Sequence, residues 1–188
     1  MSGEASCRRP GAEALSEEVI VNPDGTLRNA VVRVVSGLGP RVFAAPPVPA
    51  EMDQVGCVFV PHVLAAQAGQ VVLFENSDPA VHNVRAIAKE NRTFNVSMAG
   101  KGRSAHRYFT RPEAVRIRCD IHAWMEAWIV VVDSPFHAVT GDGGAFALEG
   151  LPAGTYVVEA WQESLGSARQ TVTLADGEHR DLEFAFGR

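Results

Sequence analysis

The segment CDIHAWM, residues 119–125, places three side chains that bind soft metal ions within seven positions. Cys119, His122 and Met125 supply a thiol, an imidazole and a thioether, with two residues between each and the next. Thiolate and imidazole ligands suit copper and zinc. A cysteine nucleophile would instead need a base, an orienting third residue and an oxyanion site. The sequence shows no motif for these, so the segment favours a metal site.

The strand that leads into this segment has a clear two-residue alternation. In VRIRC, Val115 and Ile117 share one face with Cys119, while Arg116 and Arg118 share the other. We therefore expect Cys119 to leave the strand on its apolar face and to enter a sheltered pocket.

A mononuclear copper site built on one cysteine and one methionine needs a second histidine. Such a site is a trigonal set of two histidines and one cysteine with a weak axial methionine. His82, in ENSDPAVHNV, lies between the apolar runs VVLF and NVRAI and is the candidate. Asn83 beside it can form a hydrogen bond between the two ligand loops. Buried cysteine and methionine often only pack, but the four ligand types together favour a site.

The pattern FVPHVLAAQAGQVVLFENSDPAVHNV followed by VRIRCDIHAWMEAWIVVV resembles the cupredoxins, specifically the plastocyanin and amicyanin group. The spacing Cys-x₂-His-x₂-Met is the short loop of amicyanin, and the resemblance covers roughly residues 55–132. It implies a Greek-key β-sandwich that carries electrons rather than an enzyme. It also implies one copper ion bound by His82, Cys119, His122 and Met125.

Three further residues near this pattern are candidate additional ligands. Cys57 falls where plastocyanins carry an apolar residue beside the copper, so it is a buried hydrophobe, a second sulfur ligand, or a disulfide partner of Cys119. His62 is expected on the surface, with a secondary metal role as the alternative. Glu126 follows the axial methionine and is expected to be solvated, although a carboxylate there could produce a red copper site.

These extra candidates leave other functions open. A copper protein of the nitrosocyanin kind would use one of them and an open coordination position for catalysis or ligand binding. A copper carrier would bind and release Cu(I) without redox cycling. A closed zinc site is a further alternative, and its ligands would be Cys57, Cys119, His82 and His122.

A second module is indicated near the C-terminus. The hairpin GDGGAF (141–146) and the turn GLPAGTY (150–156) resemble the carboxypeptidase regulatory-like, prealbumin-type β-sandwich, whose turns need glycine at positive φ. Its expected roles are packing, stability or docking, since it holds no catalytic motif.

The expected domain organisation follows from these two resemblances. Residues 1–19 form a flexible tail, residues 20–40 and 134–188 form the smaller sandwich, and residues 41–133 form the inserted cupredoxin domain. The competing assignment gives residues 28–36 to the cupredoxin as its first strand.

The chain as a whole is expected to be all-β, because short alternating or β-branched runs dominate and helical periodicity is nearly absent. Residues 36–53 are rich in proline and glycine and are expected to form a loop or linker. Strands are expected at residues 30–35, 57–60, 71–76, 114–119, 127–132, 145–150, 155–161, 170–174 and 182–186.

The charge of the chain indicates which kinds of macromolecule it can bind. The 188 residues carry a formal charge of −5, which argues against a general nucleic-acid binder. Basic residues concentrated in residues 101–118 could steer an acidic redox partner protein by raising the encounter rate.

The location is expected to be the periplasm or the outer cell surface. No apolar run is long enough to span a bilayer, and the first residues lack the apolar core of a signal peptide, so such a peptide was either removed or never present. Cys7 is expected to be an unpaired thiol, with a lipid anchor at EASC as the alternative.

Overall fold

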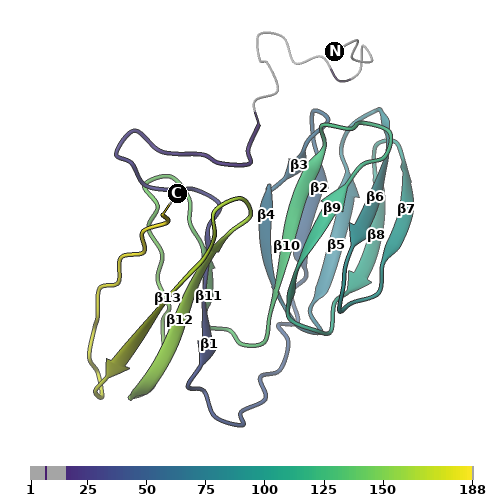
Figure 1. Cartoon of the computed structure of the whole chain (residues 1–188). Coiled ribbons are helices and arrows are strands. Elements are labelled where there is room, and N and C mark those ends of the chain that lie inside the picture. Colours follow the sequence, from purple (N-terminus) through teal and green to yellow (C-terminus); the bar gives the residue numbers. More distant parts are fainter. Residues whose placement is uncertain (1–6, 8–15, 188) are drawn as a thin grey trace. The chain divides into compact units, whose positions relative to one another are not determined.

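The computed structural model describes Cys7 and residues 16–187, and these residues form β-strands and no α-helix (Figure 1). The prediction of an all-β chain is confirmed. The described residues divide into two compact units. Of the described residues, the first comprises Cys7, Ser16 and Ala45–Asp133, and the second comprises Glu17–Ala44 and the residues from Ser134 onward. The tail predicted for residues 1–19 lies for the most part outside the described residues.

The first unit contains two sheets within the described part of the chain. The larger has the order β4-β10-β9-β6-β7, and the smaller has the order β3-β2-β5-β8. Neighbouring strands are antiparallel except for the β4–β10 and β2–β5 pairs, which are parallel. The larger sheet consists of β4 (Val63–Gln67), β10 (Glu126–Val132), β9 (Glu113–Arg118), β6 (Val81–Ile87) and β7 (Phe94–Ala99). The smaller consists of β3 (Phe59–Val60), β2 (Ala50–Gln54), β5 (Val71–Asn76) and β8 (Arg103–Tyr108).

One hydrophobic cluster lies between these sheets and makes the first unit a β-sandwich. Ile117 and Ile129 come from the larger sheet, and Met52 and Phe74 come from the smaller one. All four are fully buried. Cys119 belongs to the same cluster, so the predicted alternation along β9 is confirmed.

The strand predictions for this unit differ from the structure in three places, at residues 36–53, at β3 and at β8. The stretch predicted as a loop at residues 36–53 contains most of β2. The strand predicted at residues 57–60 shrinks to β3, because Gly56 and Cys57 both adopt a left-handed backbone, with φ of 62° and 58°. β8 was not predicted because its sequence, RSAHRY, is mostly polar.

The second unit contains a single antiparallel sheet within its described residues. Its order is β11-β1-β12-β13. The strands are β11 (His137–Val139), β1 (Val31–Ser36), β12 (Gly154–Gln162) and β13 (Gly166–Leu174).

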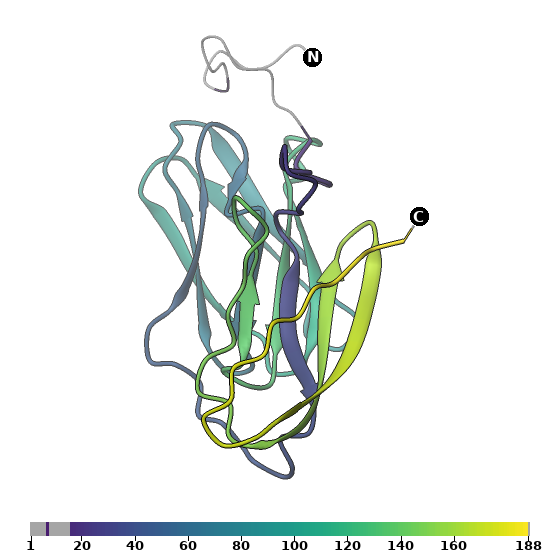
Figure 2. The ribbon, with the colours of Figure 1, turned by 90° about the vertical axis from the view of Figure 1, so that its left-hand side faces the viewer.

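The strands predicted at residues 145–150 and 182–186 are absent from this unit. Figure 2 shows the C-terminal segment as an extended chain in yellow without a strand arrow. The apolar side chains of both segments pack on the sheet without pairing as strands, and these side chains are Phe146, Leu148, Leu182, Phe184 and Phe186. The alternation of apolar residues therefore predicted burial correctly but not the strand hydrogen bonds. The prealbumin-type assignment remains a prediction.

A buried carboxylate on β12 links the side chains of three neighbouring strands of this sheet. Glu159 lies opposite Arg33 on one neighbouring strand and Arg169 on the other. Arg33 Nη2 donates to Oε1 at 2.8 Å, and Arg169 Nε donates to Oε2 at 2.7 Å. Burial alone would raise the pKa of Glu159, but the hydrogen bonds and charges of the two arginines outweigh it and lower that pKa.

This ion cluster predicts an acid-sensitive second unit. Because the pKa of Glu159 is lower in the folded than in the unfolded chain, its stabilisation is present above the ordinary glutamate pKa and is lost as the pH falls through the folded value. Glu159→Gln should lower the free energy of unfolding by about 2 kcal/mol at neutral pH. The difference from wild type should shrink in acid.

Hydrogen exchange of the β12 amides measures this difference for the second unit alone. The control is Asp142→Asn, whose exposed ion pair with Arg28 should contribute less than about 1 kcal/mol. An equal effect of Glu159→Gln in acid and at neutral pH would contradict the prediction.

Candidate metal centre

The first candidate ligand, His82, is positioned by the connection from β5 to β6. Asn76 ends β5, and its Nδ2 donates to the carbonyls of Ala80 at 3.0 Å and Met98 at 2.8 Å. Its Oδ1 accepts the backbone N–H of Asp78 at 2.9 Å. These three hydrogen bonds fix the turn, so His82 enters the interior of the first unit, where it is fully buried.

The loop between β9 and β10 carries the other candidates and is closed by its own backbone. The N–H of Cys119 donates to the carbonyl of Met125 at 3.1 Å, and the N–H of Met125 donates to the carbonyl of His122 at 2.9 Å. Cys119, His122 and Met125 are all buried. The two-residue spacing of the sequence therefore becomes one tight turn.

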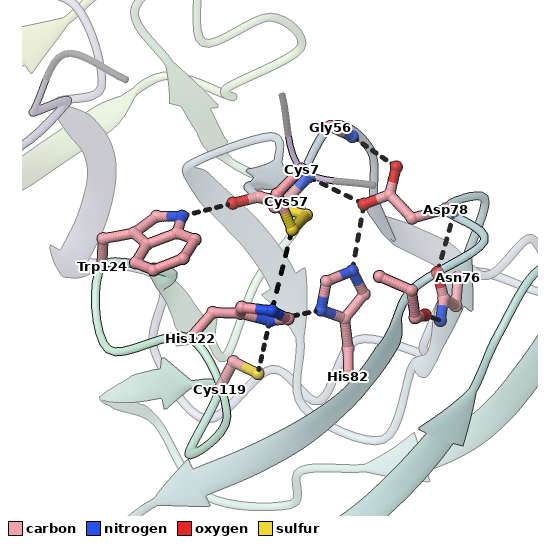
Figure 3. Close-up of a disulfide and its surroundings, with 10 residues drawn as sticks. Cys7, Gly56, Cys57, Asn76, Asp78, His82, Cys119, His122 and Trp124 are labelled. Carbon is pink, nitrogen blue, oxygen red and sulfur yellow. Dashed lines mark hydrogen bonds and ion pairs between the residues drawn. A yellow bond between two sulfur atoms is a disulfide. The ribbon is translucent and has the colours of Figure 1, made fainter. Parts of the chain in front are cut away.

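Three donor atoms meet, one from His82 on β6 and two from the loop between β9 and β10 (Figure 3). His82 Nδ1 lies 2.9 Å from His122 Nδ1, and His122 Nδ1 lies 3.8 Å from Cys119 Sγ. One donor atom from each of the three residues lies within 4.8 Å of the other two. The sequence-predicted residues are thus brought together, with Met125 buried in the same hydrophobic cluster as Cys119.

These distances fit a single metal ion. Metal–nitrogen bonds of about 2.1 Å and a metal–sulfur bond of about 2.3 Å, at roughly tetrahedral angles, place two nitrogens about 3.4 Å apart and nitrogen and sulfur about 3.6 Å apart. The observed separations of 2.9 and 3.8 Å each lie within about half an ångström of those values. His122 therefore needs only small side-chain movements to share a metal ion with either neighbour, and a donor atom of His82 lies within 4.8 Å of Cys119 Sγ.

The ring of His82 is oriented by a buried carboxylate. Asp78 Oδ2 lies 3.0 Å from His82 Nε2, which leaves Nδ1 facing His122. Carboxylates commonly hold the second ring nitrogen of metal-binding histidines in this way. The sequence prediction missed Asp78, and the available signal was a carboxylate four residues before the candidate histidine.

Asn83 forms the predicted connection to the Cys119 loop, although it and His82 lie on strand β6 and not on a loop. Its Oδ1 accepts the backbone N–H of Asp120 at 2.7 Å and lies 3.3 Å from the Cys119 thiol. Its Nδ2 donates to Asn95 Oδ1 at 2.7 Å and to Asp120 Oδ2 at 3.2 Å. One side chain thereby fixes the spacing of Cys119 from the strand that carries His82.

Asp120 lies at the outer side of this network. Desolvation acts to raise the pKa of Asp120, but it is outweighed by hydrogen bonds from Arg85, Asn95 and Asn83 and by the charge of Arg85, so the pKa is lowered. The Asp120 carboxylate is therefore ionised at neutral pH and adds a fixed negative charge beside the ligand loop.

A disulfide corrects the predictions made for Cys7 and Cys57. Cys7 and Cys57 are bonded to each other, and Cys119 is the free cysteine of the three. Cys7 is therefore not an unpaired thiol, and its sulfur is not available for a thioether lipid anchor. Cys57 is neither bonded to Cys119 nor a thiolate donor while the disulfide is intact.

The other two additional candidates lie apart from the donor cluster. His62 is buried rather than on the surface, and its carbonyl accepts the backbone N–H of Trp128 at 2.8 Å. Glu126 binds Arg116, whose Nη2 donates to Oε2 at 2.6 Å. Among the described residues, neither His62 nor Glu126 belongs to a group of converging donor atoms.

Trp124 lies at the edge of the site. Its ring centroid lies 5.1 Å from that of His122, and its Nε1 donates to the carbonyl of Cys57 at 2.9 Å. The side chain is 38% exposed, whereas His122 is only 3% exposed. Trp124 is therefore an aromatic contact between His122 and the surface.

No family model matches the chain, and no curated protein matches it. Within the residues that the structure describes, no helix has the length and apolar character needed to cross a bilayer.

Several solved structures resemble part of the chain. A copper-containing nitrite reductase from Thermus scotoductus SA-01 is 27% identical over 54% of this chain and 26% of its own, with a TM-score of 0.44. The chain thus spans about a quarter of that protein. A purple cupredoxin from Nitrosopumilus maritimus is 20% identical over 44% of this chain and 99% of its own, with a TM-score of 0.39. A Cu(I) form of a mutant amicyanin is 21% identical over 54% of this chain and 98% of its own, with a TM-score of 0.41.

The hydrogen bonds of Asn83 predict that its replacement lowers the free energy of unfolding more than replacement of Asn95 does. Asn83→Ala should lower the free energy of unfolding by about 1–2 kcal/mol, because the N–H of Asp120 loses its acceptor. Asn95→Ala is the matched control, since it removes two hydrogen bonds of the same network but leaves Asn83 Oδ1 in place. Chemical denaturation measures both variants. Equal losses would show that Asn83 Oδ1 has no special role.

Proposed function

We propose that the first unit is a cupredoxin-type electron-transfer module with one type 1 copper ion, held by His82, Cys119, His122 and Met125. The observation that carries this proposal is the convergence of two imidazole Nδ1 atoms and one buried thiol. Copper supplies one-electron chemistry when bound, by cycling between Cu(II) and Cu(I). The protein residues supply a fixed, shielded set of donors.

The donor set favours copper over zinc. Structural zinc sites use four strong donors from cysteine, histidine or carboxylate. The fourth sulfur considered for such a site, that of Cys57, is bonded to Cys7. The remaining fourth donor is the thioether of Met125, and two histidines, one cysteine and a weak methionine form the typical blue-copper set.

The rigidity of the donors favours electron transfer over catalysis. Asp78 holds His82, and Asn83 holds the Cys119 loop, so the donor atoms have little freedom to rearrange. A catalytic site of the nitrosocyanin kind would need an open position or an added ligand. Two of the candidates for that ligand are engaged elsewhere, Cys57 in the disulfide and Glu126 with Arg116.

The route for electrons to a redox partner protein would pass through His122. Its ring contacts Trp124, which is the more exposed of the two aromatic groups. The partner itself is unidentified. A periplasmic or extracellular location is supported by the disulfide, because such bonds persist in oxidising compartments.

Copper loading tests the ligand assignment. The full chain titrated with Cu(II) should gain one intense visible band from thiolate-to-copper charge transfer, reaching its maximum at one ion per chain. Cys119→Ser should abolish the band, and His82→Ala should weaken or shift it. His106→Ala is the control, since this exposed histidine belongs to no group of converging donors among the described residues. A colourless wild type, or a band that survives Cys119→Ser, would contradict the proposal.

The axial role of Met125 makes a separate prediction. Met125→Leu should retain the visible band and change the reduction potential, because the axial ligand tunes the potential of such sites. The substitution nearly conserves volume, so its stability cost should be below about 1.5 kcal/mol. Met52→Leu, at an equally buried position on β2, is the control and should leave the potential unchanged. Equal potentials for Met125→Leu and wild type would exclude Met125 as a ligand.

A further inference from the structure

The two ring nitrogens of His122 face different groups of sulfur and nitrogen atoms. Nδ1 faces His82 and Cys119, which form the inner donor set. Nε2 faces outward, 3.7 Å from the Sγ of Cys7 (Figure 3). The Cys7–Cys57 disulfide therefore covers the outer edge of the imidazole that the inner site uses.

Cys57 is held in place by contacts other than the disulfide. Its backbone adopts the left-handed conformation, with φ of 58°, which is uncommon for a residue with a side chain. Asp78 Oδ2 accepts its N–H at 2.7 Å, and Trp124 Nε1 donates to its carbonyl at 2.9 Å. Unfavourable backbone conformations persist where the surroundings determine them, and they occur often at functional sites. The sulfur of Cys57 should thus remain beside His122 when the disulfide is broken.

The sulfurs of Cys7 and Cys57 are bonded to each other, and a ring nitrogen of His122 lies within 4.8 Å of both. Once the bond between the sulfurs is broken and they move apart, the three atoms can surround one ion. We propose that these residues form a second metal site, separate from the inner donors, which opens when the disulfide is reduced and binds Cu(I). The inner site does not have to bind copper for this to hold.

A dithiol reductant supplies the electrons and protons that open the outer site. Reduction breaks the bond between the two Sγ atoms and adds two electrons and two protons, while the dithiol becomes a disulfide. Cu(I) then displaces the two thiol protons and binds both thiolates without a change in its own oxidation state. Exchange with an external disulfide, which takes up the two electrons and two protons from solvent and becomes a dithiol, re-forms the bond between the two Sγ atoms, removes both thiolate ligands and releases the ion.

Cu(I) fits this outer donor set better than zinc does. Two thiolates and one imidazole are soft or borderline ligands, and thiolates select Cu(I) and zinc. A structural zinc ion needs a fourth strong donor. The carboxylate of Asp78, which lies within 4.8 Å of the Cys57 sulfur, already accepts hydrogen bonds from Gly56 and Cys57 and contacts His82.

Shared use of His122 gives the outer site a role in metal delivery. A neutral imidazole has a lone pair on one ring nitrogen at a time. An ion that binds Nε2 and an ion that binds Nδ1 therefore compete for the same side chain. This competition suits an entry site that takes Cu(I) at the outer edge and passes it to the inner donors.

The test uses the full chain with Cys119→Ser, in which Cys7 and Cys57 are the remaining cysteines. The protein is reduced with a dithiol, freed of reductant under nitrogen, and titrated with Cu(I) against a chromogenic Cu(I) chelator. The reduced form should bind one Cu(I) ion per chain, at least an order of magnitude more tightly than the disulfide form. Adding Cys7→Ser should remove this binding, and adding His106→Ala should not.

Several results would overturn the proposal. These are equal affinity of the reduced and disulfide forms, retention of the affinity after Cys7→Ser, and displacement of Cu(I) by equimolar zinc. Wild type gives a second measurement, in which the reduced chain should bind Cu(I) more tightly than the disulfide form, because both donor sets then offer thiolates, although the two sites share His122. If the disulfide form of wild type binds no copper while the reduced form binds one ion, the inner copper site is refuted and the outer site is supported.

Discussion

The carboxylate of Asp78 holds two separate parts of the first unit, the turn at Gly56 and Cys57 and the ring of His82. Its Oδ1 accepts the N–H of Gly56 at 2.6 Å, and its Oδ2 accepts the N–H of Cys57 at 2.7 Å and contacts His82 Nε2 at 3.0 Å. Because Asp78 is itself buried, these partners replace the water that the charge would otherwise need. The positions of an inner donor and of the disulfide next to it therefore depend on one side chain.

The sandwich brings the ligand loops together through its topology. The turn that contains Asp78 passes from β5 in the smaller sheet to β6 in the larger sheet. The loop that contains His122 connects β9 and β10, which are neighbours in the larger sheet. Asn83 then links the two loops by hydrogen bonds at their bases. A rigid β scaffold can thus hold donor atoms within bonding distance of one ion before the ion binds.

The sequence predicted the parts of this arrangement that depend on local pattern. Alternation along β9 placed Cys119 on the buried face, and the residue types and spacing around it identified the three converging donors. The pairing of Cys7 with Cys57 joins positions 50 residues apart, and no local pattern encodes such a contact. Asp78 was missed because a carboxylate after a strand more often lies in a solvated turn. The segments at 145–150 and 182–186 have strand-like alternation, yet alternation reports burial and not the hydrogen-bond partner that defines a strand.

Locating copper in the loaded protein shows whether the ion binds the proposed inner donors. Crystals of the full chain with one equivalent of copper, measured with X-rays at the copper absorption edge, would locate the ion by its anomalous scattering. The proposed inner site predicts one main peak bonded to His82 Nδ1, His122 Nδ1 and Cys119 Sγ, at distances of about 2.0–2.3 Å. A main peak on surface histidines, or one that lacks the bond to Cys119, would contradict it.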